Sequence, residues 1–190
     1  MHSDSWALKA KKLGLRSRAV FKLEEILIKT KTLQKNSLVL DIGAAPGGWS
    51  KLIKTMAPSS SVFAIDLLPM DPIKDVIFFQ KDILNIDEIE EISILKSKFD
   101  LVISDLAPNL TGIKAVDEEN IFNLNVFTLR IALNYLRKSN GSFLIKTFQN
   151  SLLKKLRTEM EKSFHLVQTY KPAASKSKSA EIYLYGEKPL

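Results

Sequence analysis

The sequence predicts an α/β fold built on a mostly parallel, doubly wound β-sheet with helices on both faces. Three observations support this prediction. Short apolar runs rich in β-branched residues alternate with stretches of helical periodicity, a glycine-rich segment directly follows the first run, and the first two runs carry an acid near their carboxyl ends. Alternation of this kind is typical of βαβ units, in which consecutive strands are parallel and the helices cover the sheet.

Seven strands and five helices are expected in chain order. From their apolar runs, the strands are predicted at 37–42, 61–66, 76–82, 99–109, 141–149, 165–172 and 180–186. The helices are predicted at 16–30, 49–57, 86–98, 117–138 and 151–164. In the first of these helices, Val20, Leu23 and Leu27 fall on one face, as expected for an amphipathic helix that packs on the sheet.

The composition is that of an ordinary globular domain. The chain has 190 residues, of which 45% are hydrophobic and 26% charged, which suffices for one domain with a well-formed core. We expect a single domain over 1–190, with a basic arm and helix at 1–30 and the α/β core at 36–190. No apolar run reaches the ~18 residues that a membrane span needs, and the first residues lack the apolar segment of a secretory signal.

Cysteine is absent from the sequence. Its absence excludes disulfide bonds, thiolate nucleophiles and cysteine-ligated zinc sites. The two histidines, His2 and His165, are too few and too scattered for a metal site or a catalytic triad. We therefore expect no bound metal, no membrane association and a cytoplasmic location.

Positive charge is concentrated at the two ends of the chain. Residues 1–35 contain nine Lys/Arg and three acids, residues 36–145 contain ten and fourteen, and residues 146–190 contain nine and four. The net charge of +7 could reflect scattered solubilising lysines. Two basic ends around an acidic centre suit a polyanion held across a site. Charge alone leaves both interpretations open.

The segment DIGAAPGG joins the first strand to the next helix. Glycine-rich turns also occur for structural reasons, and this spacing is not the G-x-G-x-x-G of dinucleotide sites. Ligands of doubly wound sheets bind at the carboxyl ends of the strands, where Gly43–Gly48, Asp66, Asp82, Asp105 and Lys146 fall. Asp66 could bind a ribose diol, and Asp82 an adenine amine. A glycine loop and two acids without a phosphate cradle predict S-adenosylmethionine as the ligand.

Several longer strings resemble one family. They are GLRSRAVFKLEEI, LVLDIGAAPGGWS, DLLPMDPI, SDLAPNLTG followed by AVD, FLIKTFQ and KPAASKSKSAEIYLYG. In this order, from about residue 6 onward, the chain is similar to the FtsJ/RrmJ family of heat-shock ribosomal RNA ribose methyltransferases. The resemblance implies a Rossmann-like, class I S-adenosylmethionine-dependent methyltransferase fold with a seven-stranded, mostly parallel sheet.

The loop and the acids together give a set of expected cofactor contacts. This set is Gly43, Pro46, Gly47, Trp49, Asp66, Asp82 and Asp105. Trp49 could be either a wall of the cofactor pocket or a residue of the hydrophobic core.

The resemblance also implies a catalytic tetrad of Lys, Asp, Lys and Glu. Residue by residue, it falls on Lys22 in RAVFKL, Asp105 in SDLAPN, Lys146 in FLIKTFQ and Glu181 in AEIYL. Taken singly, Lys22 would be a solvated helix residue, Asp105 a turn cap and Glu181 an edge-strand charge. A lysine inside the apolar strand 141–149 is harder to explain structurally, because a buried unpaired lysine is costly.

Lys146 is the expected general base, because a ribose hydroxyl is a poor nucleophile until its proton leaves. Burial and the nearby cation Lys22 would favour the neutral amine, whereas Asp105 and Glu181 would favour the ammonium. We assign Asp105 to orienting Lys146 and the methyl donor, and Lys22 and Glu181 to positioning the ribose.

RNA-binding residues are expected in both basic ends. They are Lys9, Lys11, Lys12, Arg16, Arg18, Lys176 and Lys178. Trp6 could stack on RNA or anchor a helix. Two features depart from the family. Asn150 and Ser151 replace a usual glycine and acid, and Lys176 and Lys178 stand where arginines, with their bidentate fork, are more usual.

The resemblance implies 2′-O-methylation of a uridine ribose in 23S rRNA, and we expect a monomer that acts on the assembled 50S subunit. A tRNA or an mRNA cap is an alternative substrate for the same reaction. A non-catalytic ribosome assembly factor is opposed by the intact tetrad, and a small-molecule methyltransferase by the two basic ends.

Overall fold

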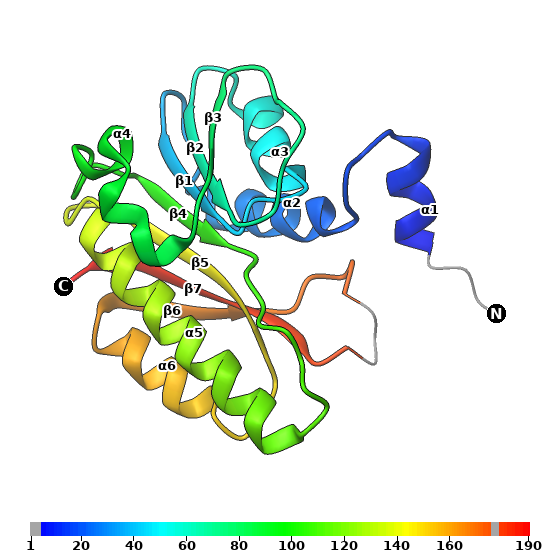
Figure 1. Ribbon diagram of the computed structural model, residues 1–190, viewed down its shortest axis with the longest axis vertical. Helices are drawn as coiled ribbons and strands as arrows, with labels where there is room; N and C mark the ends of the chain where they lie inside the picture. The colour runs from blue at the N-terminus through cyan, green and yellow to red at the C-terminus, as the bar shows by residue number, and fades with distance from the viewer. Residues whose placement is uncertain (1–4, 176–178) are drawn as a thin grey trace.

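Figure 1 shows a single sheet flanked by helices in the computed structural model, which describes residues 5–175 and 179–190. The strands lie in the spatial order β3-β2-β1-β4-β5-β7-β6. Their bounds are β1 (Leu38–Ile42), β2 (Ser61–Asp66), β3 (Val76–Gln80), β4 (Leu101–Ser104), β5 (Ser142–Phe148), β6 (Phe164–Tyr170) and β7 (Glu181–Pro189). Within the described chain, β7 pairs antiparallel with β5 and with β6, and the other strand pairs of the sheet are parallel. The predicted seven-stranded, mostly parallel α/β sheet is confirmed.

Helices cover both faces of this sheet. Their bounds are α1 (Ser5–Lys12), α2 (Ala19–Thr30), α3 (Gly48–Met56), the 3₁₀ helix η1 (Ile83–Glu88), α4 (Glu90–Ser93), α5 (Lys114–Tyr135) and α6 (Leu153–Glu161). The helices α2 and α3 pack on one face, and η1, α4, α5 and α6 pack on the other. Among the described helices, none combines the length and apolar character required to cross a membrane.

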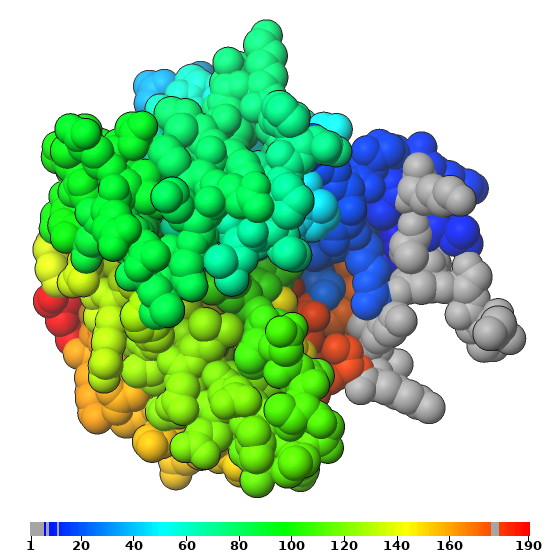
Figure 2. Space-filling view, in the orientation of Figure 1, coloured from blue at the N-terminus to red at the C-terminus, as the bar shows by residue number. Residues whose placement is uncertain are grey.

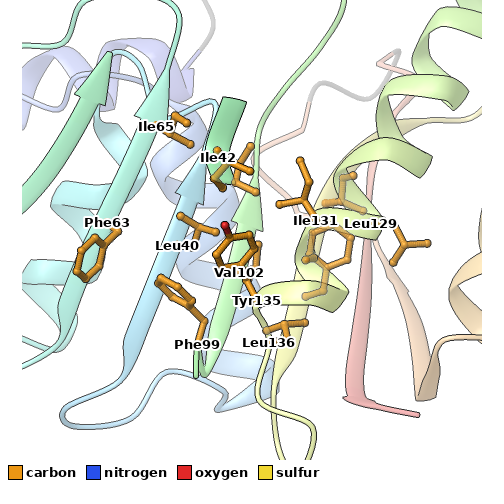
Figure 3. Packing of buried hydrophobic residues seen from close by; sticks show 14 of the residues in the cluster. Leu40, Ile42, Phe63, Ile65, Phe99, Val102, Leu129, Ile131, Tyr135 and Leu136 are labelled. Carbon is orange, nitrogen blue, oxygen red and sulfur yellow. The ribbon is translucent and has the colours of Figure 1, made fainter. Parts of the chain in front are cut away.

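Two hydrophobic clusters, one on each face, hold the sheet between its helices. Neighbouring residues of a strand point to opposite faces. Leu40 and Ile42 of β1 therefore belong to the cluster that includes α5 and α6, whereas Val39 belongs to the cluster that includes α2 and α3. Figure 3 shows the first cluster, in which the Phe99 and Tyr135 ring centroids are 6.0 Å apart. Because both faces are covered, the central strands appear in the sequence as nearly continuous apolar runs.

The prediction of one helix over 86–98 is wrong. The structure has the short 3₁₀ helix η1 and the single turn α4 in this region. The turn begins earlier than predicted, because the Asp82 side chain accepts a hydrogen bond from the backbone N–H of Leu84 at 3.0 Å. The backbone of Asn85 leaves helical φ/ψ values. The buried residues recur at every third position, a spacing that suits the tighter 3₁₀ turn: Ile86, Ile89 and Ile92.

The strand predicted over 99–109 is shorter in the structure. It ends at Ser104, which pairs with the last residue of β1, Ile42, and with Ile145 of β5. The chain then leaves the sheet, although β5 on one side continues to Phe148. Asp105 therefore lies at the open edge of the sheet and not inside a strand.

Asp41 in β1 is a completely buried carboxyl group. Its Oδ2 accepts a hydrogen bond from Ser50 Oγ at 2.6 Å. Burial raises the pKa of Asp41 to about 7, against the effect of the Ser50 hydrogen bond and helped by the charges of Asp105 and Asp66. The folded protein therefore retains this proton at mildly acidic pH values at which an unfolded chain has released it.

We expect Asp41→Asn to remove part of the pH dependence of stability. Between the ordinary pKa of 3.8 and the raised value of about 7, the folded state binds more protons than the unfolded state. The free energy of unfolding should fall as pH rises through this window, by at most about 1.4 kcal/mol per pH unit for one group. Urea unfolding across this window should show the wild-type curve falling relative to that of Asp41→Asn. Parallel curves, as expected for exposed Asp71→Asn, would contradict the assignment.

Candidate active site

The candidate site lies at the carboxyl edge of the parallel strands. Strand order reverses between β1 and β4, and ligands of doubly wound sheets bind at such a switch point. Gly43 follows β1, Asp66 ends β2 and Asp105 follows β4. All three line a cavity of about 770 Å³, within the range of ~300–1,000 Å³ that is common for small-molecule sites.

The loop between β1 and α3 forms one wall of this cavity. Gly43 has a φ of +77°, and a Cβ there would lie 2.5 Å from the Leu106 side chain, so a side chain at this position would clash. Asp66 fixes the loop from the next strand. Its Oδ2 accepts a hydrogen bond from the Ala45 N–H at 2.8 Å, and its Oδ1 accepts one from the Leu68 N–H at 2.8 Å. A carboxylate has about four acceptor positions, so each oxygen of Asp66 retains capacity for a ligand hydroxyl.

The cavity is also lined by apolar residues that were not predicted from the sequence. They are Leu67, Leu68, Ile83, Leu84, Leu106, Leu124 and Phe127. The side chains of Leu68 and Leu84 are 64% and 67% exposed. Large apolar side chains left in contact with solvent at a cavity are suited to cover a flat heterocycle. Hydrophobic periodicity reports burial within the chain, so it gave no signal for residues whose partner is a ligand.

The seven predicted cofactor residues divide into two groups. Four line the large cavity: Gly43, Asp66, Asp82 and Asp105. Pro46 and Trp49 instead line a small adjoining cavity of about 20 Å³. Gly47 is the N-cap of α3, has a φ of +93° and lines neither of these cavities.

Trp49 lies in the core on the α2 side of the sheet. It is 3% exposed. Its indole N–H donates to the Ala19 carbonyl at 3.1 Å, and its ring centroid lies 6.0 Å from that of Tyr183. Of the two roles considered for Trp49, this burial favours core packing.

The structure brings the four predicted tetrad residues together as two ion pairs. Lys146 Nζ lies 3.0 Å from Asp105 Oδ1 and also donates to the Asp105 backbone carbonyl. Lys22 Nζ donates to Glu181 Oε1. The pairs are close enough to interact, because the charges of Lys22 and Glu181 act on Asp105. The side chains of Lys22, Glu181 and Lys146 are only 6%, 16% and 12% exposed.

The two carboxyl groups respond differently to this environment. Burial raises the pKa of Asp105 above its ordinary value, despite the opposing charge and hydrogen bond of Lys146. Burial would also raise the pKa of Glu181, but the hydrogen bond and charge of Lys22 outweigh it, so the pKa of Glu181 is lowered. Glu181 is therefore the more firmly ionised member of the cluster.

The pairing of β5 with β7 places two of these side chains on the same face. Lys146 is opposite Tyr183 in the antiparallel register, and Glu181 lies two residues before Tyr183 on that face. The buried Tyr183 hydroxyl donates to Glu181 Oε1 at 2.9 Å. Sequence reasoning missed this hydroxyl, although alternation along the strand placed it beside Glu181. Lys22 reaches the group from α2, which packs on the same face.

Lys9 and Lys12, two of the predicted RNA-binding residues, are exposed on α1. Lys9 Nζ lies 5.1 Å from the Trp6 ring centroid and 4.9 Å from that of Phe21. The Trp6 and Phe21 rings are themselves 5.1 Å apart. Together with Ala10 and Ala174 these rings form a small cluster, which favours the role of Trp6 as a helix anchor. In Figure 1, α1 stands at one side of the sheet near the segment that leads into β7.

Arg16 and Arg18 are half-buried, unlike Lys9 and Lys12. The Arg16 guanidinium donates to three backbone carbonyls. Arg18 lies near enough to Tyr183 for its charge to act on that hydroxyl. The remaining predicted positions, Lys176, Lys178 and the Lys11 side chain, lie outside the described residues.

The loop after β5 departs from the family pattern, and its side chains have local partners. Asn150 Oδ1 accepts a hydrogen bond from the Leu152 N–H at 3.0 Å, and Ser151 Oγ donates to Glu118 of α5. In the part of the chain that the structure describes, no three His, Cys, Asp or Glu side chains are grouped so that they could hold a metal ion.

A cavity at the switch point of a seven-stranded sheet, lined by Gly43 and Asp66, is the arrangement of a Rossmann-like ligand-binding domain. The FtsJ-like methyltransferase family matches residues 15–188, and the chain belongs to that family.

Curated relatives and solved structures agree with this family. The ribosomal RNA large subunit methyltransferase E of Ehrlichia chaffeensis is 40% identical over 97% of this chain and 88% of its own length. Its counterpart in Methanothrix thermoacetophila is 39% identical over 98% of this chain and 73% of its own length. A putative ribosomal RNA methyltransferase from Plasmodium falciparum has a TM-score of 0.82 at 33% identity, covering 92% of this chain and 98% of that one.

Lys22 and Glu181 should contribute to the stability of the fold as a coupled pair. Lys22→Met leaves Glu181 without its cation, and Glu181→Gln leaves a buried ammonium. We expect each to lower the free energy of unfolding by about 2–3 kcal/mol, below the ~3–5 kcal/mol of fully buried pairs because Glu181 keeps some solvent contact. The double variant should lose less than the sum of the two single losses, as a double-mutant cycle from denaturant unfolding would measure. Strict additivity would argue against the pairing.

Proposed function

We propose that this protein transfers the methyl group of S-adenosylmethionine to a ribose 2′-hydroxyl of a uridine in large-subunit ribosomal RNA. The observation that carries the proposal is the Lys146–Asp105 pair at the edge of the sheet, because Asp105 also lines the large cavity. The lysine proposed as the base is thus paired with a residue of the cavity lining. The names of the relatives from Ehrlichia and Methanothrix support ribosomal RNA as the substrate.

The cavity has the features that S-adenosylmethionine requires. Asp66 has free acceptor capacity for the two ribose hydroxyls. Asp82 Oδ1 caps η1, which leaves Oδ2 for an adenine amine. Leu68, Leu84 and Phe127 supply apolar surface for the adenine ring. When bound, S-adenosylmethionine supplies an electrophilic methyl carbon. Because it carries no phosphate groups, the protein has no need of a phosphate cradle.

The tetrad would activate and place the acceptor hydroxyl. In its neutral form, Lys146 Nζ accepts the 2′-hydroxyl proton, and the resulting ammonium is stabilised by Asp105 at 3.0 Å. The two contacts from Lys146 to Asp105 also fix the direction of the amine. Lys22 and Glu181 are held together in a nearly buried pair, which suits them to positioning the ribose. Alignment of the reacting atoms would supply a large share of the rate.

The rest of the RNA would be held by the basic end segments. Lys9 and Lys12 are exposed on α1, beside the segment that leads into β7. Phosphate contacts from such residues are independent of base identity and weaken as salt rises. We propose that the substrate is the assembled 50S subunit, and that the protein acts on it as a cytoplasmic monomer. The tRNA and mRNA-cap alternatives have no observation in their favour.

Substrate and donor can be tested in one experiment. The protein would be incubated with methyl-labelled S-adenosylmethionine and, in parallel, undermethylated 50S subunits, free 23S rRNA, tRNA or capped RNA, followed by nucleotide mapping. We expect label on one uridine ribose of 23S rRNA, with 50S subunits as the best substrate. Label confined to tRNA or capped RNA would overturn the ribosomal assignment.

Asp66→Ala should weaken binding of S-adenosylhomocysteine, the demethylated cofactor. We expect a loss of about 1–3 kcal/mol, because ribose hydroxyls would lose their acceptor and the Ala45 N–H its partner. Isothermal titration calorimetry gives the affinity, and Glu88→Ala, an exposed acid away from the cavity lining, is the matched control. Equal affinity for wild type and Asp66→Ala would remove Asp66 from the cofactor site.

Lys146→Arg should nearly abolish methyl transfer while cofactor affinity is retained. A guanidinium keeps the positive charge but cannot accept a proton, and a general base contributes about 10²–10⁴-fold to the rate. The measurement is the single-turnover rate at saturating cofactor and RNA, and the wild-type rate should rise with pH. A variant that retains more than about a tenth of the rate would limit Lys146 to electrostatic positioning.

A further inference from the structure

Arg16 makes an unusual set of contacts for a residue in a basic arm. Its Nη1 donates to the Pro46 carbonyl at 2.8 Å and to the Asp71 carbonyl at 2.9 Å, and its Nη2 donates to the Pro72 carbonyl at 3.2 Å. A guanidinium has five N–H donors, so three of them are directed at backbone oxygens of this chain. Two distant segments, the loop after β1 and the segment after β2, are thereby held by one side chain.

The end of the Arg16 side chain lies close to Gly47 and to two apolar side chains. A Cβ placed on Gly47 would lie 2.8 Å from Arg16 Nη1, 2.6 Å from Met70 Sδ and 2.7 Å from Ile73 Cδ1. The arm, the β1–α3 loop and the segment after β2 therefore meet around Gly47, and the ends of these three side chains would have to shift to admit a Cβ. The φ of +93° at Gly47 also favours glycine at this position.

Both segments held by Arg16 also line the large cavity. The β1–α3 loop contributes Gly43 and Ala45, and the segment after β2 contributes Leu67 and Leu68. Asp66 connects them from the cavity side through the Ala45 and Leu68 N–H groups. Arg16 connects the same two segments further along the chain, through the carbonyls of Pro46, Asp71 and Pro72. The loop and the segment are therefore joined at two places, one by Asp66 and one by Arg16.

We propose that Arg16 is a positioning residue of the cofactor site, and not one of the phosphate ligands of the basic arm. It acts through the loop and the segment that it ties together, which set the width of the cavity. The inference rests on the proposed use of S-adenosylmethionine. It divides the arm by role: exposed Lys12 serves the RNA, while half-buried Arg16, a few residues further on, serves the cofactor.

The test compares three variants in two binding measurements. Affinity for S-adenosylhomocysteine is measured by calorimetry, and affinity for a 23S rRNA transcript is measured as a function of salt. Arg16→Ala should lower affinity for S-adenosylhomocysteine by about ten-fold or more, the usual effect of losing hydrogen bonds from a charged group. The affinity of Arg16→Lys for S-adenosylhomocysteine should lie between those of wild type and Arg16→Ala, since a single ammonium cannot reproduce the planar fork of a guanidinium. In both variants the salt slope of RNA binding should stay at the wild-type value.

Lys12→Ala is the matched control, and it should show the opposite effects in the two measurements. It should leave affinity for S-adenosylhomocysteine unchanged and flatten the salt slope by about one unit, as the loss of one phosphate contact does. Unfolding curves of the unliganded variants separate a cofactor effect from general destabilisation. If Arg16→Ala fails to fold, Arg16→Lys decides with the same two measurements.

Each outcome has a distinct meaning. Weaker S-adenosylhomocysteine binding with an unchanged salt slope supports the inference. Unchanged cofactor affinity with a flatter slope would return Arg16 to the RNA-binding set and overturn it, and so would unchanged values in both measurements. A wild-type protein that binds no S-adenosylhomocysteine would overturn the proposed cofactor itself, and this inference with it.

Discussion

The site depends on one electrostatic constraint, which is that a lysine in the middle of a buried strand needs a carboxylate partner. Lys146 lies in β5 among almost fully buried neighbours, and an unpaired ammonium there would carry a large desolvation cost. Asp105 meets this need because β4 ends one residue earlier and turns its next side chain to the sheet edge. The edge that provides a partner for the charge is also the edge where a ligand can bind. The stability of the fold and the proposed function thus both depend on a carboxylate at Asp105.

Much of the fold and of the tetrad could be predicted because both leave local signals. Strands buried on two faces give continuous apolar runs, and their ends place Asp66 and Asp105 at a common edge. A lysine within such a run is itself conspicuous. The tetrad assignment needed the resemblance, however, because Lys22 and Glu181 look ordinary in their own segments. Only tertiary contact makes them a pair.

The errors have physical causes of a similar kind. The prediction of a helix over 86–98 failed because the three-residue spacing of Ile86, Ile89 and Ile92 suits a 3₁₀ turn, and because the capping by Asp82 was not anticipated. The contacts of Arg16 with three carbonyls could not be predicted, because charge in a sequence says nothing about acceptors supplied by distant backbone. The apolar cavity wall was missed because exposed leucines, such as Leu68 and Leu84, resemble ordinary surface positions until a ligand is considered.

The position of β7 has a consequence for how the site is assembled. This strand lies between β5 and β6 although it follows both in the chain, and Glu181 at its start meets Lys22 across a separation of 159 residues. Closing so long a loop is entropically costly and slow compared with local contacts. The Lys22–Glu181 pair therefore exists only when both ends of the domain have docked. On the role proposed for this pair, fraying at either end would stop methyl transfer while most of the sheet remained folded, so activity would report on completion of the whole fold.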